Sequence, residues 1–186
     1  MIRKTPILIV AVLCFAAADL ARAQDLHPSR RPSPIGIAKT HLGDTYVKVT
    51  YGRPYVRNRQ IFGTNTDSTQ FLTPYGQLWR TGANEATVFS VTGDVTINGE
   101  ALAAGVYGLF TIPGESEWTI IFNNQPDQWG AFDYDQSQDA LRVTVTPEEA
   151  DAVEWRAFYF GELTNNSAKA FLHWDTVQVP FTIASQ

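Results

Sequence analysis

Short apolar runs separated by turn-forming residues are the feature that most constrains this chain. From Thr45 onward, β-branched and aromatic residues occur in brief runs bounded by Gly, Asn, Asp and Pro. Asn98-Gly99 lies between two of these runs and is typical of a type I′ hairpin, because both residues tolerate a positive φ. Along Ala168–Trp174, apolar side chains alternate with Lys169 and His173, as in a strand that buries one face. A fold of antiparallel strands is therefore expected.

The same runs predict the individual strands, and they leave little room for helix. Thr146-Pro147-Glu148-Glu149 resembles a capping box with Pro at the first helical position, which predicts a helix of one or two turns at most. The resulting fold class is all-β, an antiparallel β-sandwich with the jelly roll as one variant. Strands are predicted over Thr45–Tyr51, Ala86–Thr92, Val95–Ile97, Val106–Ile112, Trp118–Phe122, Leu141–Thr146, Val153–Phe160, Ala168–Trp174 and Val177–Ile183.

Residues 1–23 have the features of a signal peptide. A basic start is followed by the apolar run Ile7–Ala18, and Ala21-Arg22-Ala23 supplies the small residues that a signal peptidase recognises. The run is too short to span a bilayer, so no membrane insertion of the mature chain is expected. The single cysteine, Cys14, follows Leu13 instead of a small residue, which argues against a lipoprotein. We expect an exported, soluble protein of the periplasm or the exterior, without disulfides.

Two further segments follow the predicted signal peptide. Residues 24–44 contain a polar stretch interrupted by prolines, which predicts an extended leader into the domain. Residues 45–186 suit a single β-sandwich domain with a substantial core. The whole chain has a formal charge of −5. Loss of residues 1–23 removes three basic residues and one acidic residue, so the mature chain is still more acidic, and nucleic-acid binding is not expected.

Five stretches of the mature chain together carry a resemblance to a known family. They are VTYGRPYVRNRQIFG (49–63), LTPYGQLWRTGANEATVFSVTGDVTINGEALAAGVYGLFTIPG (72–114), EWTIIFN (117–123), QWGAFDYDQSQDALRV (128–143) and TNNSAKAFLHWDTVQVPFTI (164–183). They resemble the secreted bacterial proteins grouped as domain of unknown function 2911. The resemblance covers nearly all of the mature domain and implies a compact exported β domain, but it carries over no catalytic residue.

The stretch Asp133-x-Asp135-x-Ser137-x-Asp139 resembles the first half of a calcium loop. An EF-hand needs Gly at position 6 and Glu at position 12, and here these positions hold Gln138 and Thr144, so that motif is rejected. An irregular calcium site on the three aspartates remains the minority interpretation. Asp and Ser side chains also bond nearby backbone N–H groups, so we favour a turn in which Asp135 and Asp139 are the main turn-formers. No cofactor is favoured.

The first candidate ligand site is the segment from Trp79 to Glu85. Arg80 has the planar fork that clamps a carboxylate or phosphate, and Asn84 and Glu85 could orient such a ligand. The structural alternative, which we favour, pairs Arg80 with Glu85 beneath the loop while Trp79 closes the end of the sandwich.

The second candidate site is the tract that begins at Tyr51. Arg53, Arg57 and Arg59 lie among tyrosines in an otherwise acidic chain, which suits an anionic or sugar ligand at a strand exit. Pairing of these arginines with the protein's own carboxylates is the interpretation we favour. Two aromatic residues of the aspartate-rich stretch are further candidate contacts for a ligand, Trp129 and Tyr134.

Signatures of catalysis are absent from the sequence. It contains no nucleophile elbow, no phosphate-binding glycine loop and no pair of histidines spaced for zinc. The preferred hypothesis is therefore a non-catalytic module that binds a small ligand, a glycan or an envelope partner. The alternatives are an envelope hydrolase that uses carboxylates or a divalent ion, and a purely structural envelope domain.

Overall fold

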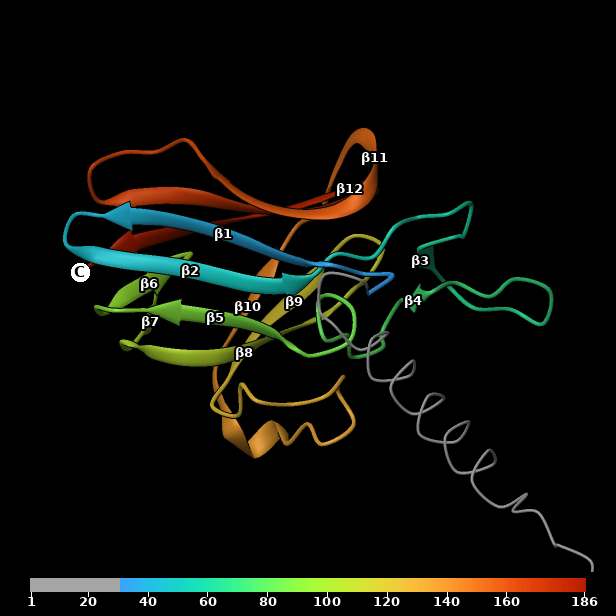
Figure 1. Cartoon of the computed structure of the whole chain (residues 1–186), viewed down its shortest axis with the longest axis horizontal. Helices are drawn as coiled ribbons and strands as arrows, with labels where there is room; N and C mark the ends of the chain where they lie inside the picture. Colours follow the sequence, from blue (N-terminus) through green and yellow to red (C-terminus); the bar gives the residue numbers. More distant parts are fainter. Residues whose placement is uncertain (1–30) are drawn as a thin grey trace, which may run out of the picture.

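The computed structural model describes residues 31–186, and these residues form an antiparallel β-sandwich (Figure 1). The predicted fold class is confirmed. The predicted signal peptide and the first part of the predicted leader lie outside the described residues. No helix within residues 31–186 is long and apolar enough to cross a membrane.

The larger sheet has six antiparallel strands. Its spatial order β1-β2-β5-β8-β9-β10 follows the order of the chain, interrupted only where other strands are inserted. Successive strands are therefore mostly joined by direct antiparallel connections. The strands are β1 (Ile35–Leu42), β2 (Thr45–Gly52), β5 (Thr87–Val91), β8 (Gly105–Ile112), β9 (Trp118–Asn123) and β10 (Asp139–Val145).

The smaller sheet has four strands in the order β11-β12-β6-β7. The hairpin of β6 and β7 turns at Asn98-Gly99 with φ values of 50° and 93°, as the sequence predicts. Strand β12 joins two predicted strands into one, and it continues through Asp175 at a positive φ of 55°. The strands are β11 (Glu148–Gly161), β12 (Ser167–Ser185), β6 (Val95–Ile97) and β7 (Glu100–Leu102).

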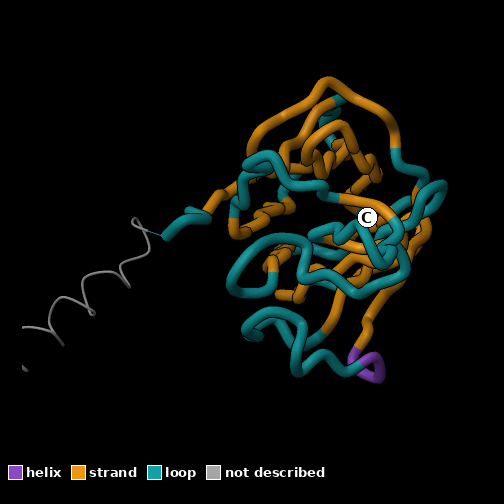
Figure 2. The backbone as a smooth tube through the Cα atoms, turned by 90° about the vertical axis from the view of Figure 1, so that its right-hand side faces the viewer, coloured by secondary structure: helices purple, strands orange, loops and turns teal. Residues whose placement is uncertain are grey.

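The two sheets enclose one large apolar core. Figure 1 shows β11 and β12 stacked over the strands of the larger sheet, and Figure 2 shows how little of residues 31–186 is helical. Alternate side chains of β2 and β5 point inward, among them the fully buried Val47, Val49 and Phe89. A third, two-stranded parallel sheet of β3 (Phe62–Gly63) and β4 (Thr73–Pro74) extends from one end of the sandwich.

Two local predictions are wrong. Residues 35–42 were assigned to the leader, but they form β1, which pairs with β2 along its whole length. The prolines of this segment end at Pro34, so every residue of β1 can donate its backbone N–H to a sheet. The predicted helical turn at 146–149 is also absent, because Glu148 and Glu149 pair with β12. Sheet pairing there outweighs the local capping signal, and the only short helix is η2 (Gln136–Gln138) within residues 31–186.

Candidate functional site

The two arginine-containing segments predicted from the sequence meet at one end of the larger sheet. The chain leaves β2 after Gly52 and enters β5 at Thr87, and these two strands are antiparallel neighbours with Thr50 opposite Val88. The tract 53–59 follows β2 and the loop 79–85 leads into β5, so both segments lie at the same end of the larger sheet. Gly52 allows the contact, because a Cβ there would lie 2.0 Å from the carbonyl oxygen of Ala83.

Hydrogen bonds to β8 and β5 hold the 79–85 loop in place. Trp79 and Thr111 exchange both backbone hydrogen bonds, and the Thr81 hydroxyl donates to that of Thr111 at 3.1 Å. Thr81 is fully buried at a φ of 55°, although β-branched residues rarely adopt the left-handed region. Asn84 has a φ of 65° in the same loop. Backbone strain of this kind persists where the surroundings over-determine it and is concentrated at functional sites.

Trp79 closes this end of the sandwich, as the structural interpretation predicts. Its ring stacks on that of Trp174 at a centroid distance of 5.8 Å, and it meets Trp118 and Phe62 edge-on. Its indole Nε1 donates to the carbonyl of Gly82 at 3.1 Å. The aromatic cluster therefore forms a rigid floor for the residues that surround it.

Above this floor lies a cavity of about 310 Å³, which we call the arginine cavity. Three arginines line it, and no Asp or Glu does. Its wall is completed by the segment just before β1, to which Asn84 donates a hydrogen bond at the carbonyl of Ser33. The lining residues are Pro32, Ser33, Pro54, Tyr55, Arg57, Arg59, Leu72, Thr73, Trp79, Arg80, Gly82, Ala83, Asn84 and Trp174.

The arginines of the cavity make no ion pair within residues 31–186. Arg57 donates to the carbonyl of Pro32, and Arg59 donates to the carbonyls of Tyr55 and Val56. The favoured expectation that this tract pairs with the protein's own carboxylates is therefore wrong. The guanidinium groups of these arginines bond to backbone carbonyls instead. Within residues 31–186, the Glu154 carboxylate does contact this tract, but it accepts from the backbone N–H of Arg57 at 2.9 Å.

Arg80 likewise does not pair with Glu85. The Glu85 carboxylate instead binds Arg31, so the predicted ion pair beneath the loop is wrong. Burial is the largest effect and raises the pKa of Glu85, but the hydrogen bond from Arg31, a backbone hydrogen bond and the charge of Arg31 together hold the pKa below its usual value. The buried Nε of Arg80 has no hydrogen-bond partner among residues 31–186, and burial lowers the pKa of this guanidinium.

Further polar groups of the cavity wall also lack partners within residues 31–186. They are the hydroxyl of Thr73 and the indole N–H of Trp174, which belong to residues that are almost fully buried. Buried polar groups in proteins nearly always have a hydrogen-bond partner, because leaving one unpaired costs about 1–3 kcal/mol. Unpaired N–H groups of Arg80 and Trp174 in one wall call for a ligand that carries acceptor atoms.

Arg156 lies behind the same wall and is completely buried. Its Cζ lies 5.7 Å from the ring centre of Trp79, and none of its side-chain nitrogens has a partner within residues 31–186. Sequence reasoning missed this residue, as it missed Thr73 and Trp174. The sequence did indicate that Arg156 points inward, because it lies two residues before the inward-facing Phe158 and therefore shares its face of the strand.

The other candidate residues of the two segments lie outside the arginine cavity, namely Tyr51, Arg53 and Glu85. The Tyr51 hydroxyl accepts a hydrogen bond from the backbone N–H of Phe158 at 2.9 Å, and thereby joins the two sheets. Tyr51 and Glu85 line a separate surface cavity. The guanidinium of Arg53 lies over the ring of Trp155 at 5.8 Å.

The two aromatic candidates after β9 also lie elsewhere. Trp129 is bridged to Glu85 through the backbone and leaves 57% of its surface exposed. The Tyr134 ring packs on Phe110, and its hydroxyl donates to Asp139 at 2.6 Å. Neither residue lines the arginine cavity.

The aspartate-rich stretch forms a turn. Asp135 caps η2 by accepting a hydrogen bond from the backbone N–H of Ser137, and Asp139 accepts from Asn123, Tyr134 and Arg142. Asp133 is exposed. Within residues 31–186, no three His, Cys, Asp or Glu side chains converge on a point where a metal ion could bind.

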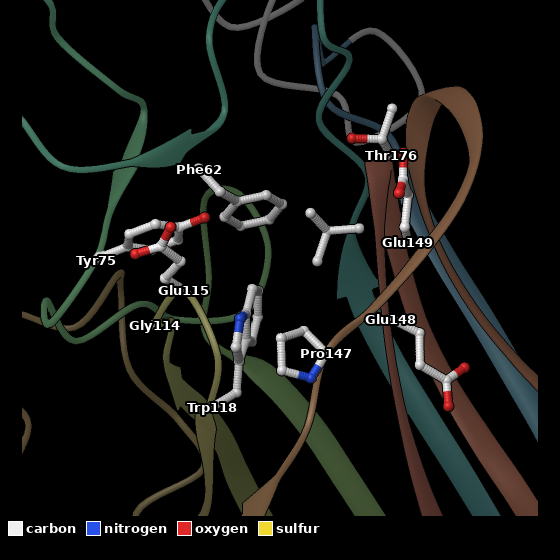
Figure 3. A pocket seen from close by; sticks show the side chains of 10 residues that line it. Phe62, Tyr75, Gly114, Glu115, Trp118, Pro147, Glu148, Glu149 and Thr176 are labelled. Atoms are coloured by element: carbon white, nitrogen blue, oxygen red, sulfur yellow. The ribbon is translucent and has the colours of Figure 1, made fainter.

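A smaller cavity of about 180 Å³ lies on another side of the aromatic cluster (Figure 3). Phe62, Trp118 and Pro147 line its centre, and Tyr75 lies beside Glu115 at its edge. Burial, and secondarily the charge of Glu115, raise the pKa of Tyr75. Its charged lining residues are all acidic, so its electrostatic character is opposite to that of the arginine cavity.

Comparison with known proteins finds one family. A family model described as "Protein of unknown function (DUF2911)" matches residues 33–183, which is nearly the whole described chain. No curated protein and no solved structure matches the sequence.

Proposed function

The chain belongs to the DUF2911 family of proteins of unknown function, and we propose from its arginine cavity that it is an exported, non-catalytic module that binds a small anionic ligand. One observation carries the proposal. Three arginines and no acidic residue line the cavity, although acidic residues outnumber basic ones in the chain. Guanidinium groups without carboxylate partners are suited to bind carboxylate or phosphate oxygens.

The three arginines differ in exposure, and this difference suits capture of an anion from solution followed by tight binding. Arg57 and Arg59 are exposed, so their charge attracts an anion from solution, and Arg80 is partly buried against the aromatic floor. The buried N–H groups of Arg80 and Trp174 lack partners within residues 31–186 and add donors in the same wall. They reach a ligand once these side chains shift, because neither nitrogen is exposed.

The test is calorimetric titration of the purified protein with inorganic phosphate and citrate, with glucose as a neutral probe. We expect the anions to bind and glucose not to bind. Arg80→Gln removes charged hydrogen bonds worth about 1.5–3 kcal/mol, so affinity should fall about 10- to 100-fold. Added salt should weaken binding further by screening Arg57 and Arg59.

Arg142→Gln is the matched control, because Arg142 pairs with Asp139 outside the arginine cavity. This variant should bind anions as the unchanged protein does. Unfolding temperatures of both variants separate the proposal from the structural alternative. If Arg80→Gln lowers the unfolding temperature markedly while anion affinity stays constant, Arg80 has a structural role and the proposal is wrong.

A further inference from the structure

A second cavity of about 320 Å³ adjoins the arginine cavity and differs from it in chemistry. The two cavities share Leu72, Thr73, Trp79 and Arg80 as lining residues. Arg80 therefore lies where the arginine cavity and the second cavity meet. We call the second space the apolar cavity, because Pro74, Leu78, Ala131 and Phe132 complete most of its wall.

Phe132 is the most exposed large apolar side chain at this site. Its surface is 84% exposed, although the side chain lines a cavity. The ring is held over Gly130, whose φ is 70° and where an added Cβ would lie 3.0 Å from the ring. A local turn thus keeps the ring at the cavity wall without burying it, and an apolar ligand group placed there would remove the ring from water.

From this arrangement we infer that the ligand is an organic anion with an apolar chain or ring, whose charge binds in the arginine cavity and whose apolar part fills the apolar cavity. The inference rests on the proposed function, because it places the charge at Arg80. The two cavities share four lining residues, Arg80 among them, so the apolar part of the ligand must attach close to its charged group. An inorganic anion would leave Leu72 and Phe132 uncovered.

The experiment measures the affinity of straight-chain carboxylates, namely acetate, butanoate, hexanoate and octanoate, by chemical-shift titration of the whole protein. Each buried methylene should raise affinity about fourfold until the apolar cavity is full. Phe132→Ala and Leu72→Ala should each lower the affinity for octanoate about tenfold. Phe132→Ala should leave the affinity for acetate unchanged, because Phe132 does not line the arginine cavity. Leu163→Ala is the matched control, because Leu163 is an exposed leucine outside both cavities.

Each outcome supports or overturns a defined statement. If acetate and phosphate bind but affinity does not rise with chain length, the inference is wrong and the proposed anion site stands. The inference is also wrong if Leu163→Ala reduces octanoate binding as much as Leu72→Ala does, since the gain would then be unspecific. If no anion binds at any length, the proposed function itself fails.

Discussion

The guanidinium carbon of Arg156 lies 4.6 Å from the ring centre of Tyr51 in the interior of the sandwich. The same group faces the Trp79 ring, so two aromatic residues surround a completely buried cation. Burial lowers the pKa of Arg156 to about 9, against a smaller opposing effect of Tyr51, so the group keeps its charge at neutral pH. Cation–π contacts offset part of the desolvation cost, by up to about 2 kcal/mol each.

We expect Arg156→Met to raise the free energy of unfolding by about 1–3 kcal/mol, because an apolar side chain of similar length removes the cost of an unpaired buried charge. Denaturant unfolding measures this change. Lys39→Met removes an exposed charge that makes no ion pair within residues 31–186 and should change stability by less than about 0.5 kcal/mol. A clear loss of stability in Arg156→Met would mean that the aromatic contacts outweigh desolvation.

The pH dependence of stability should report the same group. Since the folded pKa of Arg156 lies below that of the unfolded chain, the unfolded state binds more protons above about pH 9, until the unfolded arginine also loses its proton. The contribution of Arg156 to stability should therefore rise with pH across this window. Unfolding curves of Arg156→Met at pH 8 and pH 11 should lack this contribution, and the difference from the unchanged protein isolates it.

The aromatic floor should carry much of the stability at this end of the molecule. Trp118 is almost fully buried against Phe62 and Trp79, so Trp118→Ala should cost about 3–5 kcal/mol. Trp129→Ala makes the same substitution at an exposed position and should cost less than about 0.5 kcal/mol. Equal losses in the two variants would show that the cluster is not the core of the fold.

Close approach of two backbone segments at Gly52 should make this glycine indispensable. An added Cβ would collide with the Ala83 carbonyl at 2.0 Å, so Gly52→Ala must displace the 79–85 loop. Gly76→Ala is the control, because Gly76 has nothing within 4 Å of an added Cβ, and its positive φ of 74° is the only source of strain there. The control should cost about 1 kcal/mol, and Gly52→Ala should cost clearly more in thermal unfolding and should also weaken anion binding.

The Tyr134 hydroxyl should titrate unusually late. Burial, followed by the hydrogen bond to Asp139, raises its pKa to about 12, so the stability it contributes is present below pH 10 and is lost between pH 10 and 12. Asp139→Asn removes the negative charge and should lower the pKa of Tyr134, as followed by ultraviolet absorbance. Tyr107, whose raised pKa depends on burial and Asp94, should titrate unchanged in this variant.

Strands with a clear local pattern are the part of the fold that could be predicted. The Asn98-Gly99 hairpin and a strand over Ala168–Trp174 depend on a few neighbouring residues, and both occur in the structure. The strand does not leave its second face exposed, because Phe171 and His173 are buried as well. The segment 35–42 and Glu148–Glu149 were wrongly predicted for the opposite reason. Their backbone partners are contributed by β2 and β12, and a strand partner is invisible to local sequence patterns.

The candidate site divides in the same way. Trp79, Arg80, Asn84, Arg57 and Arg59 were identified from residue chemistry, and all of them line the arginine cavity. The pairing of charged groups was not predictable. Arg31, which lies 54 residues from Glu85 in the sequence, binds the Glu85 carboxylate, and Arg80 has no carboxylate partner within residues 31–186. Thr73 and Trp174 enter the wall only because β4 and β12 pass beside the loop.

The sequence by itself determined the all-β class, most of the strands and the two arginine-containing segments, because these depend on side-chain alternation and turn chemistry over short distances. Only the tertiary structure decided that the two segments share one cavity, that no acidic residue lines it and that Arg156 is buried behind it. These properties depend on which distant strands become neighbours, and the pairing of β2 with β5 is the step that brings the arginines together.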